Sequence, residues 1–138
     1  MIRPRYEQED DRQAEVKIME RVATALEFSD FRKLPASYVL DFAAIRGKEI
    51  AGFVEVKRRR NKMSQYPDIF VALHKLNAAR QLNMIGKKTI FAVEWDDCTG
   101  WLLLENPSHI SFTGRVDRND PADLEPMAHF PIDRVKII

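Results

Sequence analysis

Residues 38–57 read YVLDFAAIRGKEIAGFVEVK, and this stretch decides the fold. Two apolar runs, 37–44 and 50–57, lie on either side of a short polar segment that contains Gly47. Apolar runs of this length separated by a glycine turn predict two strands that pair as a hairpin. One carboxylate interrupts each run, Asp41 in the first and Glu55 near the end of the second.

These two carboxylates predict a metal site. Neighbouring strands can bring Asp41 and Glu55 together at one edge of a sheet, and hard cations such as Mg²⁺ prefer oxygen ligands. Lys57 follows Glu55 by two residues, so both side chains point to the same face of a strand. A carboxylate and an ammonium beside a metal ion can together hold a water molecule and a phosphate. The alternative is that both acids are edge-strand charges that prevent sheet-to-sheet pairing.

The tripeptide Glu-Val-Lys occurs twice, so its letters alone have little value. Glu15-Val16-Lys17 falls in a predicted helix, residues 10–27, where side chains two positions apart do not share a face. Glu55-Val56-Lys57 ends an apolar strand, follows an aspartate on the preceding strand and precedes a basic run. Only the second copy has the context that the chemistry needs.

The remaining elements predict a mixed α/β domain. A second helix is expected over residues 66–84, and Pro67 suits its first turn. The apolar residues of this helix are spread around much of its circumference. Further strands are expected at 89–95 and 101–105, and weaker ones at 110–116 and 132–138. The expected order is α-β-β-α-β-β with a C-terminal extension that contains a loop rich in Pro and Asp.

This order of elements, with Asp41 on one strand and Glu55-Val56-Lys57 on the next, resembles the PD-(D/E)XK nuclease superfamily. The resemblance covers about residues 12–105 and is strongest to small phage nucleases and archaeal Holliday-junction resolvases. One departure is that Leu40, not proline, precedes Asp41. The resemblance implies a restriction-endonuclease-like fold, a central mixed sheet flanked by helices, and a DNA substrate. It also implies that Asp41, Glu55 and the backbone carbonyl of Val56 bind Mg²⁺, with Mn²⁺ able to substitute, and that Lys57 positions or activates the attacking water.

Many members of that superfamily add a glutamate from the first helix. On a helical wheel Glu15 falls on the apolar stripe of residues 10–27, whereas Glu20 falls on the polar side. A glutamate on an apolar face is unusual unless it is paired or binds something, which favours Glu15 as a third acidic ligand. The alternatives are that Glu15 lies in a frayed first turn, or that Glu20 is the helix carboxylate.

Basic residues follow the motif directly. Arginine forks bind phosphates without reading sequence, so Arg58, Arg59, Arg60 and Lys62 are expected to contact DNA. The alternative is a solvated basic turn. Similar phage nucleases carry a lysine in the second helix that faces the active site, and this likeness implies the same role for Lys75.

Composition limits the other possibilities. The chain has 138 residues, 45% hydrophobic and 31% charged, so we expect one globular domain over residues 1–138. Its only cysteine, Cys98, and the lack of a signal or membrane segment favour the cytoplasm, of a host cell if the gene is phage-borne. The sequence contains no glycine-rich phosphate-binding loop, so a nucleotide cofactor is not expected. Three histidines, His74, His109 and His129, are scattered and have no cysteine at zinc-ligand spacing, so no zinc site is predicted.

The sequence therefore predicts a Mg²⁺-dependent endonuclease that hydrolyses DNA. A chain this small has little room for a sequence-reading domain, which favours branched or junction DNA as the substrate. Such substrates are two-fold symmetric, so a homodimer is expected. The alternative hypothesis is a catalytically silent DNA-binding module of the same fold.

Overall fold

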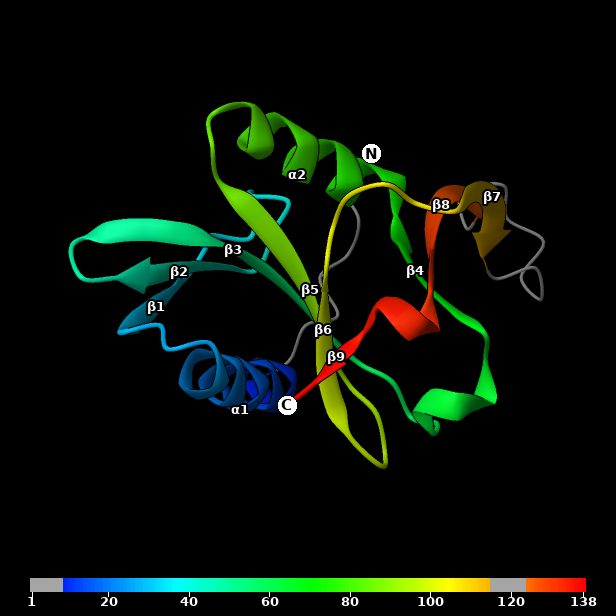
Figure 1. Ribbon diagram of the computed structural model, residues 1–138, viewed down its shortest axis with the longest axis horizontal. Coiled ribbons are helices and arrows are strands. Elements are labelled where there is room, and N and C mark those ends of the chain that lie inside the picture. Colours follow the sequence, from blue (N-terminus) through cyan, green and yellow to red (C-terminus); the bar gives the residue numbers. More distant parts are fainter. Residues whose placement is uncertain (1–8, 115–123) are drawn as a thin grey trace.

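The computed structural model describes residues 9–114 and 124–138, which form two helices and two sheets (Figure 1). The first sheet has the strand order β1-β2-β3-β5-β6-β9, and the second has the order β4-β8-β7. The helices are α1 (Glu9–Ala25) and α2 (Leu73–Met84). The strands are β1 (Asp30–Lys33), β2 (Phe42–Arg46), β3 (Glu49–Arg58), β4 (Asp68–Ala72), β5 (Lys88–Glu94), β6 (Thr99–Leu103), β7 (His109–Gly114), β8 (Leu124–Pro131) and β9 (Lys136–Ile137). Neither of these helices is long and apolar enough to cross a membrane.

The first sheet is mixed, as the sequence predicts. β2 and β3 form the expected antiparallel hairpin, with Gly47 at a positive φ of 68° in its turn. β3 then pairs with β5 in parallel, and the connection between them runs through β4 and α2. The pairs β5–β6 and β6–β9 are again antiparallel. This parallel pair beside an antiparallel hairpin confirms the mixed α/β fold.

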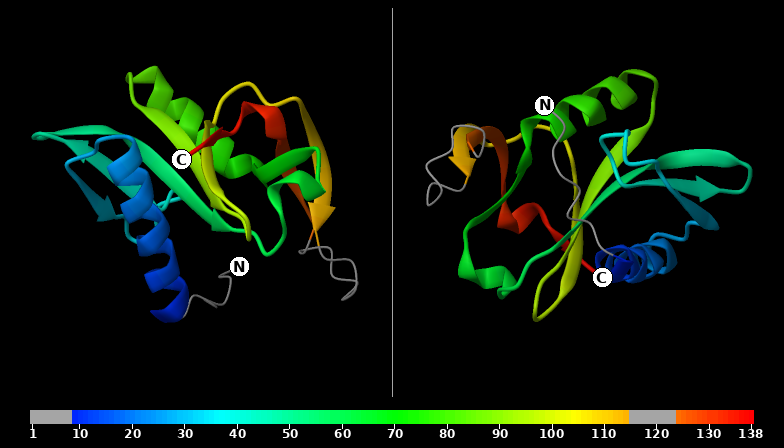
Figure 2. Two further views of the ribbon diagram at one scale, coloured as in Figure 1. Left: turned by 60° about the horizontal axis from the view of Figure 1, so that its bottom comes forward. Right: turned by 180° about the vertical axis from the view of Figure 1, so that it is seen from behind.

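The two helices cover opposite faces of the first sheet, as Figures 1 and 2 show. Along β5, Ile90 and Ala92 pack with α1, whereas Phe91 and Val93 pack with α2. Alternate residues of a strand point to opposite faces, so a strand with both faces covered is apolar throughout. The second sheet extends the core on the α2 side through four residues of β4 and β8, namely Ile69, Val71, Ala128 and Phe130.

The predicted helix over residues 66–84 is wrong in its first part. Residues Asp68–Ala72 form β4, which pairs with β8, and α2 begins only at Leu73. Ile69, Phe70 and Val71 are β-branched or aromatic and favour a strand. The broad apolar surface predicted for that helix came from joining a buried strand to a helix whose buried residues are Leu76 and Ala79.

The strand predicted over 37–44 begins later, at Phe42, and Tyr38 and Val39 are exposed in the loop before it. The break predicted after α1 contains β1, which pairs with β2. The sequence predicts a loop rich in Pro and Asp in the C-terminal extension, but Leu124–Pro131 of that segment form β8. Residues 115–123 of the same segment lie outside the described part of the chain. The strand predicted over 132–138 is a 3₁₀ turn, Ile132–Arg134, followed by the short β9.

Candidate active site

Asp41 lies immediately before β2, at the point where the β2–β3 pairing ends. The last paired residues are Phe42 and Val54, so the β3 edge beyond Val54 has no backbone partner from β2. The Asp41 carboxylate takes that place, because its Oδ2 accepts a hydrogen bond from the backbone amide of Val56 at 2.9 Å. Asp41 is thereby held against the strand that carries Glu55 and Lys57.

Glu55 is buried on β3, with only 5% of its side chain exposed. Lys75 from α2 forms an ion pair with its Oε2, while Oε1 is buried with no hydrogen-bond partner among the described residues. Burial first, and then the charge of Asp41, raises the pKa of Glu55 to about 8, although Lys75 opposes this rise. A buried carboxylate with one unsatisfied oxygen beside a second carboxylate is a site that a cation would stabilise.

Lys57 stands two residues further along the same strand and faces the same cavity. Burial of its ammonium, together with the positive charges of Arg59 and Lys75, lowers its pKa, while Glu55 and Asp41 act in the opposite direction. Lys57 therefore shares the electrostatic surroundings of Glu55, Asp41 and Lys75.

Glu15 reaches the site from α1. Lys33 of β1 bridges the two acids, because its Nζ lies 3.1 Å from Oε2 of Glu15 and 3.4 Å from Oδ1 of Asp41. Glu20 lines a different cavity, with Arg21 and Ile138. Of the two helix glutamates considered from the sequence, it is therefore Glu15 that lies beside Asp41.

The acids and lysines open into one cavity of about 520 Å³. Its lining comprises Ala14, Glu15, Ile18, Asp41, Glu55, Val56, Lys57, Arg58, Arg60 and Lys75. A second cavity of about 710 Å³ shares Asp41 and Lys75 with the first and extends along the loop 34–40 toward Arg12 and His74. The two cavities therefore adjoin at Asp41 and Lys75, and both polar and apolar residues line them.

The oxygen atoms of this site fit a hard divalent cation. Asp41 and Glu55 supply carboxylates, and Oε1 of Glu55 lacks a partner among the described residues. The amide of Val56 points at Asp41, and in a strand the amide and carbonyl of one residue project from the same edge. The Val56 carbonyl therefore projects toward the same side as these carboxylates.

Comparison with known proteins identifies the family of this chain. The model of a family described as "Phage putative PDDEXK endonuclease" matches residues 1–138. The chain belongs to this family. Among the curated proteins no sequence matches it significantly.

A solved structure supports the fold of this PDDEXK family member. Hjc of Archaeoglobus fulgidus, a Holliday junction resolvase from an archaeal hyperthermophile, superposes with a TM-score of 0.50. The two chains are 10% identical, and the match covers 86% of this chain and 84% of that one. At this identity the likeness concerns the fold alone.

The basic run predicted to contact DNA divides into two pairs. Arg58 is bound to acidic side chains at the end of β5 and beyond, Glu94 at 3.2 Å and Asp96 at 3.1 Å. Arg59 donates to the carbonyl of Phe70 at 3.2 Å and stacks over its ring. Arg60 and Lys62 are exposed, and Arg60 lines the active-site cavity.

Sequence reasoning missed Lys33. It belongs to β1, a four-residue strand with the sequence Asp-Phe-Arg-Lys, which falls in the break that the sequence predicts after the first helix. Its position beside Asp41 depends on pairing between β1 and β2, in which Lys33 is opposite Phe42. No local pattern in residues 29–35 marks it as a site residue.

Proposed function

We propose that this PDDEXK family member is a Mg²⁺-dependent endonuclease that hydrolyses DNA phosphodiester bonds at the cluster of Asp41, Glu55 and Lys57. The buried Glu55 carboxylate, with Oε1 unsatisfied beside Asp41, is the observation that carries the proposal. Burial of two acids side by side is unfavourable without a cation, and such arrangements are typical of functional sites. The family description supplies the reaction class.

In this proposal Asp41, Glu55 and the Val56 carbonyl hold the metal, and Glu15 contributes a further carboxylate from α1. Mg²⁺ prefers all-oxygen sites, and Mn²⁺ accepts the same ligands. When bound there, the ion supplies a Lewis acid that polarises the phosphodiester and offsets its negative charge.

Lys57 acts on the scissile phosphate and on the water that attacks it. Its Nζ shares the cavity with the two acids, so it can orient the water and stabilise the negative charge that develops on the phosphoryl oxygens. Hydrolysis forms a bond from the water oxygen to phosphorus and breaks the bond from phosphorus to the leaving deoxyribose oxygen, which takes up a proton. Lys75 holds Glu55 in place through their ion pair.

DNA would lie along the two adjoining cavities, one lined by Arg60 and the other by Arg12. Lys62, exposed two residues after Arg60, would add a further phosphate contact. These are phosphate-binding groups, which position a duplex without reading its bases. Selectivity for branched or four-way-junction DNA is therefore favoured over sequence selectivity. A two-fold symmetric junction is best read by a homodimer, and sedimentation or light scattering with and without junction DNA would measure this state.

The test compares plasmid, linear and four-way-junction DNA, each with Mg²⁺ or with a chelator. Wild-type protein should cut only with Mg²⁺ or Mn²⁺, and Asp41→Ala and Glu55→Ala should abolish cutting. Glu15→Ala should lower it, whereas Glu20→Ala, a glutamate of the same helix outside the cavity, should leave it unchanged. Equal cleavage by wild type and the Asp41 and Glu55 variants would reject the proposal.

The same assay distinguishes this nuclease from the alternative, a catalytically silent DNA-binding module of the same fold. Binding to DNA without cleavage by wild type, under every metal condition, would support that alternative.

The single half-buried cysteine is compatible with the reducing cytoplasm that we propose as the location, which fractionation of expressing cells would check.

A further inference from the structure

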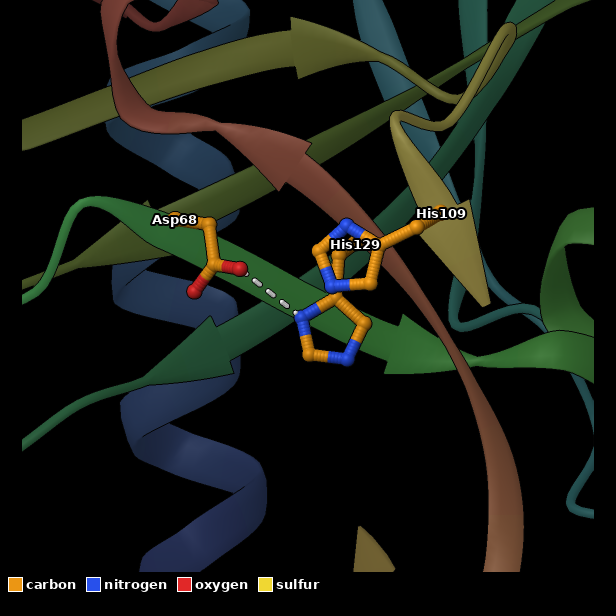
Figure 3. Close-up of side chains that lie close together, drawn as sticks. All are labelled: Asp68, His109 and His129. Atoms are coloured by element: carbon orange, nitrogen blue, oxygen red, sulfur yellow. Dashed lines mark hydrogen bonds and ion pairs between the residues drawn. The ribbon is translucent and has the colours of Figure 1, made fainter. Parts of the chain in front are cut away.

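A second group of possible metal ligands lies in the three-stranded sheet. Asp68 of β4, His109 of β7 and His129 of β8 each offer a ligand atom, and these atoms all lie within 4.8 Å of one another. His109 and His129 face each other across the β7–β8 pairing. Figure 3 shows the two imidazole rings stacked, with the Asp68 carboxylate directed at His129. None of the three lines the cavity around Asp41 and Glu55.

Each imidazole has one nitrogen within hydrogen-bonding distance of a serine hydroxyl, and the other nitrogen of His129 is hydrogen-bonded to Asp68. Ser108 Oγ lies 3.0 Å from Nδ1 of His109, which leaves Nε2 of that ring for a ligand. Ser111 Oγ contacts Nε2 of His129, and Nδ1 of His129 points at Oδ2 of Asp68 at 2.9 Å. Metal-binding histidines usually donate their second ring N–H to a neighbouring oxygen, which fixes the tautomer and the ring orientation.

We propose that Asp68, His109 and His129 form a second metal site, selective for Zn²⁺-class ions and separate from the active site. Two imidazole nitrogens and one carboxylate suit Zn²⁺, Co²⁺ or Ni²⁺ and not Mg²⁺, which prefers oxygen alone. Ligand atoms around Zn²⁺ lie roughly 3–3.5 Å apart, and the ion lies near the plane of each imidazole. Binding therefore requires a small inward shift of the group and a rotation of at least one of the two stacked rings. The ion takes the place of the Asp68–His129 hydrogen bond, and water fills the remaining positions.

Bound metal would join the three strands of the second sheet at one point. β4 continues directly into α2, whose Lys75 pairs with Glu55. Phe70 of β4 packs against the ring of His129, and the guanidinium of Arg59 lies over the Phe70 ring. The site therefore stabilises the sheet that supports one side of the active site, and it needs no nuclease activity to be detected.

The full chain is first treated with chelator and then kept in excess Mg²⁺, which occupies sites made of oxygen ligands. Binding of Co²⁺ is followed by visible absorption, and binding of Zn²⁺ by calorimetry. Wild type should bind one equivalent, with the visible spectrum of nitrogen-ligated Co²⁺, and Zn²⁺ should raise its melting temperature. His109→Ala should weaken binding by at least about tenfold, because even the loss of a residue that only orients a metal ligand costs that much. His109 is exposed, so this variant is expected to fold, whereas His129→Ala removes a half-buried ring.

His74→Ala is the matched control, since it removes the third histidine of the chain without touching the cluster. Asp41→Asn separates the two sites, and both controls should bind Co²⁺ as wild type does. The proposal is overturned if wild type binds no Co²⁺ in excess Mg²⁺, or if His109→Ala binds it equally well. Loss of binding in Asp41→Asn would assign the ion to the active site and also overturn the proposal.

Discussion

Asp41 accepts a hydrogen bond from the backbone amide of Val56 at 2.9 Å, one residue beyond Glu55 on the neighbouring strand. The contact occurs where β2 has ended and β3 continues, so a side chain replaces the missing backbone partner. One carboxylate therefore has two tasks, to complete the strand edge through Oδ2 and to supply negative charge beside Glu55.

These two tasks of Asp41 can be separated by substitution. Asn keeps an oxygen that accepts the Val56 hydrogen bond but removes the charge, whereas Leu removes both. We expect both variants to lose cleavage by at least about 100-fold, because each lacks the proposed ligand charge. Only Asp41→Leu should also lose stability, by about 1 kcal/mol, as the Val56 amide is left without its partner. Urea unfolding beside a plasmid assay checks this, and equal stability of the two variants would argue against a structural role of the bond.

The raised pKa of Glu55 predicts how the metal-free protein responds to pH. The pKa is about 8 in the fold against 4.5 as its ordinary value, so the folded state binds more protons between these values. Stability of the metal-free protein should therefore fall as pH rises from about 5 to 8. Thermal unfolding in chelator measures this slope, which Glu55→Gln should reduce and saturating Mg²⁺ should oppose. A slope unchanged by Glu55→Gln would contradict the assignment.

Lys57 should be needed for cleavage and not for metal binding. We expect Lys57→Met to lower the cleavage rate by about 100-fold or more, as for other groups that act on the attacking water. Mg²⁺ affinity, measured by calorimetry, should stay close to that of wild type. Lys48→Met removes an exposed lysine from the β2–β3 turn and is the control for charge alone. A large loss of Mg²⁺ binding in Lys57→Met would instead indicate a role in arranging the acids.

Lys33 neutralises Glu15 and Asp41 in the metal-free protein, so its ammonium competes with a cation for them. Lys33→Met should therefore raise Mg²⁺ affinity, by about threefold because the pair is partly exposed and screened. Calorimetry at low ionic strength measures the change, with Lys48→Met again as control. Weaker Mg²⁺ binding would mean that Lys33 orients these two carboxylates for the metal.

Arg58 and Arg60 should differ although they are two residues apart. Arg60 is exposed at the cavity, so Arg60→Ala should weaken DNA binding and reduce the salt slope by about one unit, as loss of a phosphate contact does. Arg58 is bound to Glu94 and Asp96, and Arg58→Ala should mainly lower the melting temperature, by about 2–4 °C. Fluorescence anisotropy at several salt concentrations and thermal unfolding distinguish the two, and identical salt slopes would contradict the division.

Much of the site could be predicted from local sequence. The hairpin, the placing of Glu55 and Lys57 on one face, and the inward position of Glu15 all follow from residues close together in the chain. Apolar residues recur every 2.0 residues in a half-buried strand and every 3.6 residues in a helix. The buried face of such an element can therefore be predicted without knowledge of the rest of the fold. The resemblance to the nuclease superfamily rested on the same local features, and the family match agrees with it.

Long-range pairing decided the rest. β4 is a strand and not the first turns of a helix because β8, about sixty residues later, pairs with it, and no window around Asp68 contains that partner. The same pairing brings His129 to Asp68, and β7 then adds His109. By itself the sequence determined which side chains face inward in the β2–β3 hairpin and in α1. Only the tertiary structure decided which elements meet, because strand pairing depends on partners distant in the chain, whereas facing depends on neighbours within a few residues.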